Sequence, residues 1–414
     1  MASDGNDVRA LAGWFPPSQE QLESWLAGHV ERVEGRRAED LRPSVAAFKD
    51  LIDRDPVVGM LVHRMVEQVP QGRDYTQRQV RDVDQLLAMI DGVLDVAPEY
   101  GQENVTLPMG AVLDWSMGTP AGYSAYRDSR MNAALRAILR EWCEFLNTPA
   151  SLYVLNDSPT GWKSASAVAD VGMEQFEHDP TDQHWGFTSW NDFFTRRLVP
   201  GARPVAAPQD DAVIVSACES TPYGLRTDVQ LHDRFWLKGQ PYSLHDMLDN
   251  DEAVTEFAGG TVYQAFLSAT DYHRWHSPVA GTVLRAWVVD GTYFSEADSL
   301  GGDDTESPDS QSYLAHVATR AIVMIRADNP AIGLMAFVAV GMSDVSSCVI
   351  TAQPGQHVDK GAELGYFQFG GSTHCLVFRP GVIAEVNLRA IPLPGDSTAP
   401  VVQVNSAIAT AVRP

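Results

Sequence analysis

The most constraining feature of this sequence is residues 367–378, Phe-Gln-Phe-Gly-Gly-Ser-Thr-His-Cys-Leu-Val-Phe, where two glycines separate two apolar, strand-like runs. Glycine inside a strand weakens it and usually marks a bulge or a tight bend. The backbone before Ser372 can therefore be held in a conformation that other residues resist. With a base and an oxyanion-stabilising group nearby, the Ser372 hydroxyl can attack the Gly371 carbonyl and form an ester. A glycine bulge in a core strand is the structural alternative, and Gly-Gly-Ser-Thr alone favours it.

A second motif favours a chemical role for Ser372 over a plain glycine bulge. Residues 271–281 read Asp-Tyr-His-Arg-Trp-His-Ser-Pro-Val-Ala-Gly. Together with Gly-Ser-Thr at residues 371–373, this motif resembles the phosphatidylserine decarboxylase family of pyruvoyl enzymes. Residues 191–204 and 238–244 agree with the same family and follow in its order. The resemblance covers roughly residues 185–390, and four ordered motifs are far more specific than any one of them.

This resemblance implies the chemistry of the chain. The precursor would cut itself between Gly371 and Ser372, and Ser372 would become a covalent pyruvoyl group, the only cofactor expected. His276 would be the base for the self-cleavage, and His273 would return a proton to the substrate after decarboxylation. The pyruvoyl ketone would condense with a substrate amine and accept the electron pair released as carbon dioxide leaves. The α and β chains cut from one precursor would stay associated.

A base that activates a serine needs a carboxylate to fix its tautomer and to stabilise its charged form. Residues 215–220, Val-Ser-Ala-Cys-Glu-Ser, stand where the family has a Pro-Ala-Asp-Gly turn, so Glu219 occupies the aspartate position. Glutamate is one methylene longer and can still accept the imidazole N–H. The alternative is a surface glutamate that follows a strand.

The spacing of His273 and His276 leaves a metal site to be considered. Both rings would lie on one side of a helical turn, whereas on a strand they would point to opposite faces. Zinc needs further ligands, and nothing nearby completes a recognisable set, so the sequence predicts no metal.

Residues 295–312 hold six acidic residues among Gly and Ser and predict a solvated loop. A weak calcium site there stays open, although the spacing is not that of an EF-hand.

Charge restricts the partners of the chain. It carries 54 acidic and 30 basic residues, a net charge of -24, which repels nucleic acid and anionic membrane surfaces. No uncharged apolar run reaches membrane-spanning length, and the N-terminus lacks the apolar core of a signal peptide. The sequence predicts a cytoplasmic protein without stable membrane insertion, whose four cysteines are free thiols.

The predicted fold class is α+β, with a helical N-terminal region followed by a mainly β decarboxylase domain that contains a barrel-sandwich-like portion. Apolar residues recur at helical spacing up to about residue 150, and short apolar runs with Gly and Pro turns follow residue 206. We expect an arm at 1–17, the helical region at 18–150, a junction at 151–205 and the decarboxylase domain at 206–414. The helical region resembles that of tryptophan decarboxylase-like members of the family.

Residues 354–365 resemble the turn of a biotinyl- or lipoyl-type barrel-sandwich. Lys360 stands where those folds keep a structural lysine, and no Met-Lys-Met attachment turn follows. We interpret this likeness as architecture. A non-enzymatic carrier or binding module is the alternative of another class, and it predicts an uncut chain.

The predicted substrate is a free aromatic L-amino acid, with tryptophan, converted to tryptamine, as the first candidate. The acidic charge, the long helical region, Glu219 and His374 resemble the tryptophan decarboxylase-like branch. Decarboxylation of phosphatidylserine to phosphatidylethanolamine is the alternative. The oligomeric state stays open, and a homo-oligomer is one of the alternatives.

Overall fold

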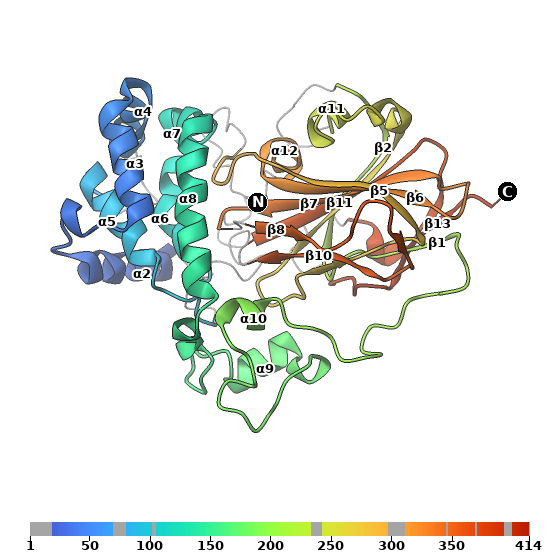
Figure 1. Cartoon of the computed structure of the whole chain (residues 1–414), viewed down its shortest axis with the longest axis horizontal. Coiled ribbons are helices and arrows are strands. Elements are labelled where there is room, and N and C mark those ends of the chain that lie inside the picture. The colour runs from blue at the N-terminus through green and yellow to red at the C-terminus, as the bar shows by residue number, and fades with distance from the viewer. Residues whose placement is uncertain are drawn as a thin grey trace, which may run out of the picture.

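A computed structural model describes residues 19–68, 80–101, 105–232, 242–296, 311–344, 347–368, 371–392 and 400–413. Helices gather in the N-terminal part, beside a C-terminal group of antiparallel sheets (Figure 1). Helices account for 36% of the described residues and strands for 24%. Because the two kinds of element are segregated instead of alternating, the fold class is α+β, which confirms the prediction.

Short polar side chains and prolines set the starts of the N-terminal helices. These helices are α2 (Gln19–Val33), α3 (Pro43–Arg54), α4 (Pro56–Glu67), α5 (Val83–Val93), α6 (Pro108–Met117), α7 (Pro120–Ala125) and α8 (Ser129–Leu146). Asp55, Asp82 and Asp128 accept backbone N–H groups at the starts of α4, α5 and α8. Proline begins α3, α4, α6 and α7, where its missing N–H costs nothing. Helix α2 ends two residues before Gly35, whose φ of 84° favours glycine.

The predicted junction packs onto the helices. It contains η3 (Pro149–Val154), α9 (Ala165–Val171), η4 (Met173–Gln175) and α10 (Trp190–Phe194). Ser189 caps α10 by accepting the Asp192 N–H at 3.1 Å. Trp162 contacts the rings of Trp190 and Phe193, with centroids 4.9 and 5.4 Å away. The apolar core of the helical region therefore extends into this segment.

Within the described residues the strands form three sheets. The largest has the order β2 (Thr221–Val229), β3 (Gly260–Leu267), β11 (Gly371–Phe378), β7 (Leu334–Met342), β6 (Arg320–Ala327), β5 (Gly281–Val289) and β9 (His357–Val358). A second sheet has the order β4 (Arg274–His276), β10 (Glu363–Gln368) and β8 (Ser347–Ile350), and a third β1 (Val213–Val215), β13 (Ala407–Ala411) and β12 (Ile383–Val386). All pairs are antiparallel, and these strands do not close into a barrel.

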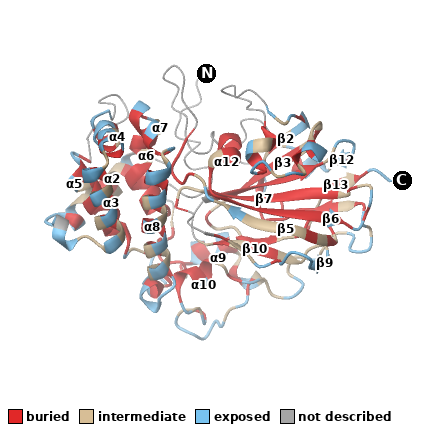
Figure 2. Ribbon diagram, turned by 45° about the horizontal axis from the view of Figure 1, so that its top comes forward, coloured by how far each residue is buried: buried red, intermediate tan, exposed pale blue. Residues whose placement is uncertain are grey.

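The largest sheet is covered on both faces, and β6 and β7 are buried along almost their whole length (Figure 2). Leu376 and Phe378 of β11 belong to a core that also contains Trp275 and Phe367 of the second sheet. Val377 instead joins the opposite core, beneath α11 (Leu244–Met247) and α12 (Gln311–Val317). Side chains on a strand alternate between faces. Ser372 therefore points into the core between the two sheets.

Lys360 has the structural role that its position suggested. Its ammonium group donates to the carbonyl oxygens of Ala207, Asp210 and Val213 at 2.8, 2.8 and 3.1 Å. The loop around residue 360 is thereby fastened to the chain that leads into β1. Gly355 and Gly361 have φ angles of 84° and 85°, which favour glycine at both turns.

Several expectations fall on parts of the chain outside this description. The arm at 1–17, residues 238–241 of one family motif and residues 297–310 of the acidic stretch lie outside the described residues. None of the four cysteines forms a disulfide, as predicted. No helix among the described residues is both long and apolar enough to cross a bilayer. The described part of the chain also contains no cluster of three or more potential metal ligands.

Candidate active site

Ser372 lies near the start of β11, on a central strand of the largest sheet. It faces Leu267 of β3 on one side and Gly341 of β7 on the other. Its side chain is buried, and its Oγ has no hydrogen-bond partner within the described residues. A buried hydroxyl without a partner is uncommon and costs free energy, so Ser372 is a candidate functional residue.

The histidine motif reaches this end of the sheet because it follows β3 directly. Leu267 is opposite Ser372, and the chain then turns through Asp271, whose carboxylate accepts the Ser268 N–H at 2.6 Å. The carbonyl of His273 accepts the N–H of Phe367 at 3.0 Å. Phe367 precedes Ser372 by five residues, so the two motifs meet at one end of the sheets.

The His273 ring lies in a buried aromatic environment. It stacks on Phe194 of α10, with the ring centroids 4.0 Å apart and the planes at 27°. Burial, and then the nearby Arg196 guanidinium, lower the pKa of His273 well below its ordinary value. In this structure the imidazole is therefore neutral at physiological pH.

His276 is the last residue of β4 and lies opposite Glu363 of β10, whereas His273 immediately precedes β4. Its Nδ1 lies 2.7 Å from the carbonyl oxygen of Gly361, and its Nε2 lies 2.9 Å from the Tyr272 hydroxyl oxygen. A carbonyl can only accept, so Nδ1 carries the proton and Nε2 is the basic nitrogen, bonded by the Tyr272 O–H. Burial lowers the pKa of His276, while Glu363 and Glu219 oppose this shift.

The two histidines therefore occupy different environments. His273 is buried beside α10, whereas His276 lines a surface cleft of about 250 Å³ together with Tyr272, Arg203 and Glu363. Within the described chain, no hydrogen bond joins His276 to Ser372 or to Glu219. The sequence did not identify the Gly361 carbonyl, which fixes the tautomer of His276; a backbone acceptor carries no sequence signal.

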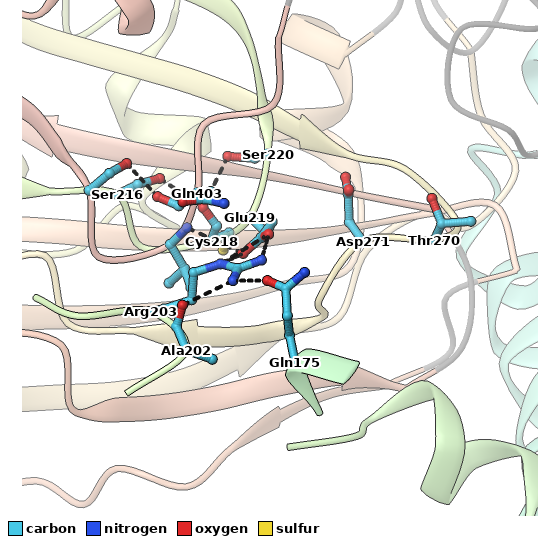
Figure 3. A network of polar contacts seen from close by, with 12 residues as sticks. Gln175, Ala202, Arg203, Ser216, Cys218, Glu219, Ser220, Thr270, Asp271 and Gln403 are labelled. Carbon is cyan, nitrogen blue, oxygen red and sulfur yellow. Dashed lines mark hydrogen bonds and ion pairs between the residues drawn. The ribbon is translucent and has the colours of Figure 1, made fainter. Parts of the chain in front are cut away.

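Glu219 is buried and paired. Its carboxylate forms a bidentate ion pair with Arg203, whose Nη1 also bonds Gln175 (Figure 3). The backbone N–H of Val404 donates to the same carboxylate at 3.4 Å. Glu219 is thus not a surface residue, and its negative charge reaches His276 without a hydrogen bond.

Arg196 is a buried residue of the site whose role the sequence did not reveal. Its Nη2 donates to the carbonyls of Thr270 and Asp271 at 2.7 and 3.0 Å. Its guanidinium lies over the ring of Phe176, 4.3 Å from the centroid. Arg196 thereby holds the turn that carries the histidine motif. Burial raises the pKa of the adjacent Asp271 carboxyl to about 7. The sequence contained one signal for Arg196, its place in the family motif at 191–197, but it did not reveal which groups this arginine would bond.

The helical region contacts the strands at this same end. In α8, Cys143 Sγ lies 3.6 Å from Gln368 Oε1, at the end of β10. At the start of α6, the Gly110 N–H donates to the Asp344 carboxylate at 2.7 Å, two residues after β7. Met342, the last residue of β7, is opposite Gly371. Helices α6 and α8 therefore adjoin the segments that lie beside the Gly371 end of β11.

Comparison with known proteins identifies the family. The family model for phosphatidylserine decarboxylase matches residues 190–395, and a second phosphatidylserine decarboxylase model matches residues 42–171. The chain belongs to the phosphatidylserine decarboxylase family, and as a member of that family it is a carboxy-lyase.

Among its relatives, decarboxylase iboD of Amanita muscaria is 43% identical over 70% of this chain and 92% of that protein. The L-tryptophan decarboxylase of Psilocybe cubensis is 32% identical over 96% of this chain and 93% of its own length. Phosphatidylserine decarboxylase proenzyme 3 of Schizosaccharomyces pombe is 34% identical, but over only 48% of this chain and 19% of its own length.

Proposed function

We propose that this protein cuts itself between Gly371 and Ser372 and then removes the carboxylate of a free aromatic L-amino acid, tryptophan first. The observation that carries the substrate class is the extent of similarity. The L-tryptophan decarboxylase of Psilocybe cubensis matches 96% of this chain, including its helical region, whereas the phosphatidylserine decarboxylase proenzyme of Schizosaccharomyces pombe matches about half of it.

The self-cleavage balances with the residues present and one water molecule. Ser372 Oγ attacks the Gly371 carbonyl carbon, the peptide C–N bond breaks, and the proton from Oγ passes to the freed amine of Ser372. Loss of the Ser372 α-proton then breaks the Cβ–Oγ bond and releases the Gly371 carboxylate. The dehydroalanine left at residue 372 reacts with water to give a pyruvoyl group and ammonia. Two chains, residues 1–371 and 372–414, remain packed through β11 and its neighbours.

His276 is our proposed base for this cleavage, on the basis of the family resemblance. Two observations support it: Gly361 holds the proton on Nδ1, which leaves Nε2 basic, and the Glu219 charge favours the imidazolium that forms. Because Nε2 is bonded by Tyr272 in this structure, the proposal requires that this bond break or that the Tyr272 hydroxyl pass the proton on.

The pyruvoyl group fits the place of Ser372, a buried hydroxyl without a hydrogen-bond partner among the described residues. When present it supplies the electron sink for decarboxylation. His273 is our proposed proton donor to the substrate α-carbon. Its ring is neutral in this structure, and a substrate carboxylate beside it would raise its pKa and load it with a proton.

Charge also supports a free amino acid over a lipid. Binding an anionic surface gains about 1 kcal/mol for each clustered Lys or Arg, whereas this chain has 54 acidic and 30 basic residues. Helices α3, α4 and α5 bury their apolar faces in the protein core. A carrier function lacks support, because the Lys360 ammonium already bonds three backbone carbonyls.

The experiment combines the mass of the chains with carbon dioxide release. Freshly purified protein should contain two chains, the smaller with a pyruvoyl N-terminus in place of Ser372. It should then release carbon dioxide from tryptophan, tyrosine or phenylalanine without added pyridoxal phosphate. A single uncut chain with full activity would contradict the self-cleavage, and turnover confined to phosphatidylserine vesicles would restore the lipid substrate.

A further inference from the structure

His374 lies two residues after Ser372 on β11, and both side chains face the core between the two sheets. The strand register places Ala265 and Ala339 on either side of His374, and Leu267 and Gly341 on either side of Ser372. Residues directly opposite each other on neighbouring strands point to the same face. Three of these four neighbours are Ala or Gly, so small side chains surround the pair.

Aromatic contacts hold the His374 ring in this core. Tyr263 meets it edge-on with the ring centroids 6.2 Å apart, and Phe337 lies 6.0 Å from it on the other side. The ring is fully buried, and burial lowers the pKa of His374 to about 3. At neutral pH it therefore offers one N–H donor and one acceptor nitrogen.

Neither ring nitrogen of His374 makes a well-formed hydrogen bond within the described residues. The Ala265 carbonyl interacts with the ring and opposes the lowering of its pKa, but this oxygen already accepts the Thr373 hydroxyl at 3.0 Å. Ser372 Oγ, on the same face of the same strand, also has no partner there. Two buried, unsatisfied polar side chains side by side cost free energy that a packed apolar pair would not.

We propose that the neutral His374 ring donates its N–H to the ketone oxygen formed at residue 372 in the processed enzyme, and so makes this ketone more reactive toward amines. The inference rests on the proposed function. It accounts for a polar ring in a position where β-strand packing alone favours an apolar side chain.

The test measures the ketone itself as well as turnover. The processed enzyme is treated with hydroxylamine, and the rate at which the small chain gains the oxime mass is followed by mass spectrometry. We expect His374→Leu to be cut to the same extent as the wild type. It should form the oxime about tenfold more slowly, because one hydrogen bond to the ketone is lost. Its kcat should fall by a larger factor than its KM rises. Wild-type reactivity in His374→Leu would overturn the inference.

Three further variants separate a hydrogen bond from a packing effect. His374→Asn and His374→Gln carry an amide N–H near the positions of Nδ1 and Nε2, so one of them should recover reactivity and the other should not. Equal rates in both would contradict the proposal, even if His374→Leu fails to accumulate. Tyr263→Phe keeps the ring contact and serves as the matched core control, which should react as the wild type does. A Tyr263→Phe rate as low as that of His374→Leu would instead assign the effect to packing.

Failure of the proposed function can be distinguished from failure of the role of His374. If the wild-type small chain carries no ketone and forms no oxime, then self-processing and the inference fall together. If the wild type and His374→Leu form the oxime at one rate and both decarboxylate tryptophan, then only the role of His374 falls.

Discussion

Arg203 and Glu219 form a bidentate ion pair beside His276. The guanidinium Nε and Nη2 contact both carboxylate oxygens at 2.5–3.2 Å. The exposed fractions of the two side chains are only 8% and 11%. Arginine matches a carboxylate in this fork geometry, so the pair is specific as well as charged. The carboxylate that the sequence assigns to His276 is thus already held by a cation in the uncut chain.

Replacing Glu219 by Gln should have two separable effects. Self-cleavage should slow by about 10²–10⁴, as when an orienting carboxylate is lost from a serine triad. The uncut protein should also lose about 3–5 kcal/mol of stability, because a buried guanidinium is left without its partner. A time course of the appearance of two chains measures the first effect, and urea unfolding on a Ser372→Ala background measures the second.

The double variant Arg203→Met/Glu219→Gln is the matched control. It removes both charges, so it should recover much of the stability while its cleavage stays slow. Cleavage of the double variant at the wild-type rate would show that Glu219 serves only to pair with Arg203.

The two histidines should differ in the step they affect. His276→Ala and Ser372→Ala should stay uncut, because one loses the base and the other the nucleophile. His273→Ala should be cut and should decarboxylate at least about a hundredfold more slowly, the usual loss for a general acid. Gel mobility and carbon dioxide release measure the two steps on the same samples. If His273→Ala stays uncut and His276→Ala is cut normally, the two roles are exchanged.

Tyr272→Phe reports on the route of the proton. It keeps the ring but removes the hydroxyl that bonds His276 Nε2. If this bond merely breaks before cleavage, Tyr272→Phe should be cut at least as fast as the wild type. If the hydroxyl passes the proton on, the variant should be cut more slowly.

Much of the fold was accessible from the sequence, because periodic apolar residues and turn residues report on local structure. The end of α2 before Gly35 and the start of α10 after Ser189 illustrate such local signals, a glycine with a positive φ and a serine N-cap. The division at residues 17, 150 and 205 stays a prediction. The same is true of the cytoplasmic location and the oligomeric state.

The site was accessible only in part. The four ordered motifs identified the family and named Ser372 and the two histidines. What local patterns cannot give is which polar groups meet after folding. The acceptor for His276 is the backbone carbonyl of Gly361, 85 residues away, and the partner of Glu219 is an arginine from a loop. Such contacts depend on strand register and on the packing of the helical region, which single residue types do not encode.

Replacing Lys360 by Met should lower stability without loss of any attached group. The three carbonyls that the ammonium bonds would lose their donor, which we expect to cost about 1–3 kcal/mol at this partly exposed site. Lys360→Arg, which keeps the charge and several donors, should lose less. Urea unfolding measures the change, and intact mass should show an unmodified Lys360. A biotinyl or lipoyl mass on this residue would revive the carrier interpretation.

The contact between Asp344 and α6 should make stability depend on pH. Burial raises the pKa of Asp344 from its ordinary value of 3.8 to about 8, against the opposing hydrogen bonds from Gly110 and Met109. The folded chain therefore keeps a proton that the unfolded chain has already released. The stabilising contribution is complete below about pH 4 and is lost as the pH rises through about 8.

Asp344→Asn keeps an oxygen for the Gly110 N–H but cannot ionise. On a Ser372→Ala background it should match its parent near pH 4 and be the more stable of the two above about pH 8, by at least about 1.4 kcal/mol, the equivalent of one pKa unit. Thermal unfolding across this range measures the difference. A difference for Asp344→Asn that does not change with pH would mean that this carboxyl is already ionised in the folded protein, and that the start of α6 binds it as an anion.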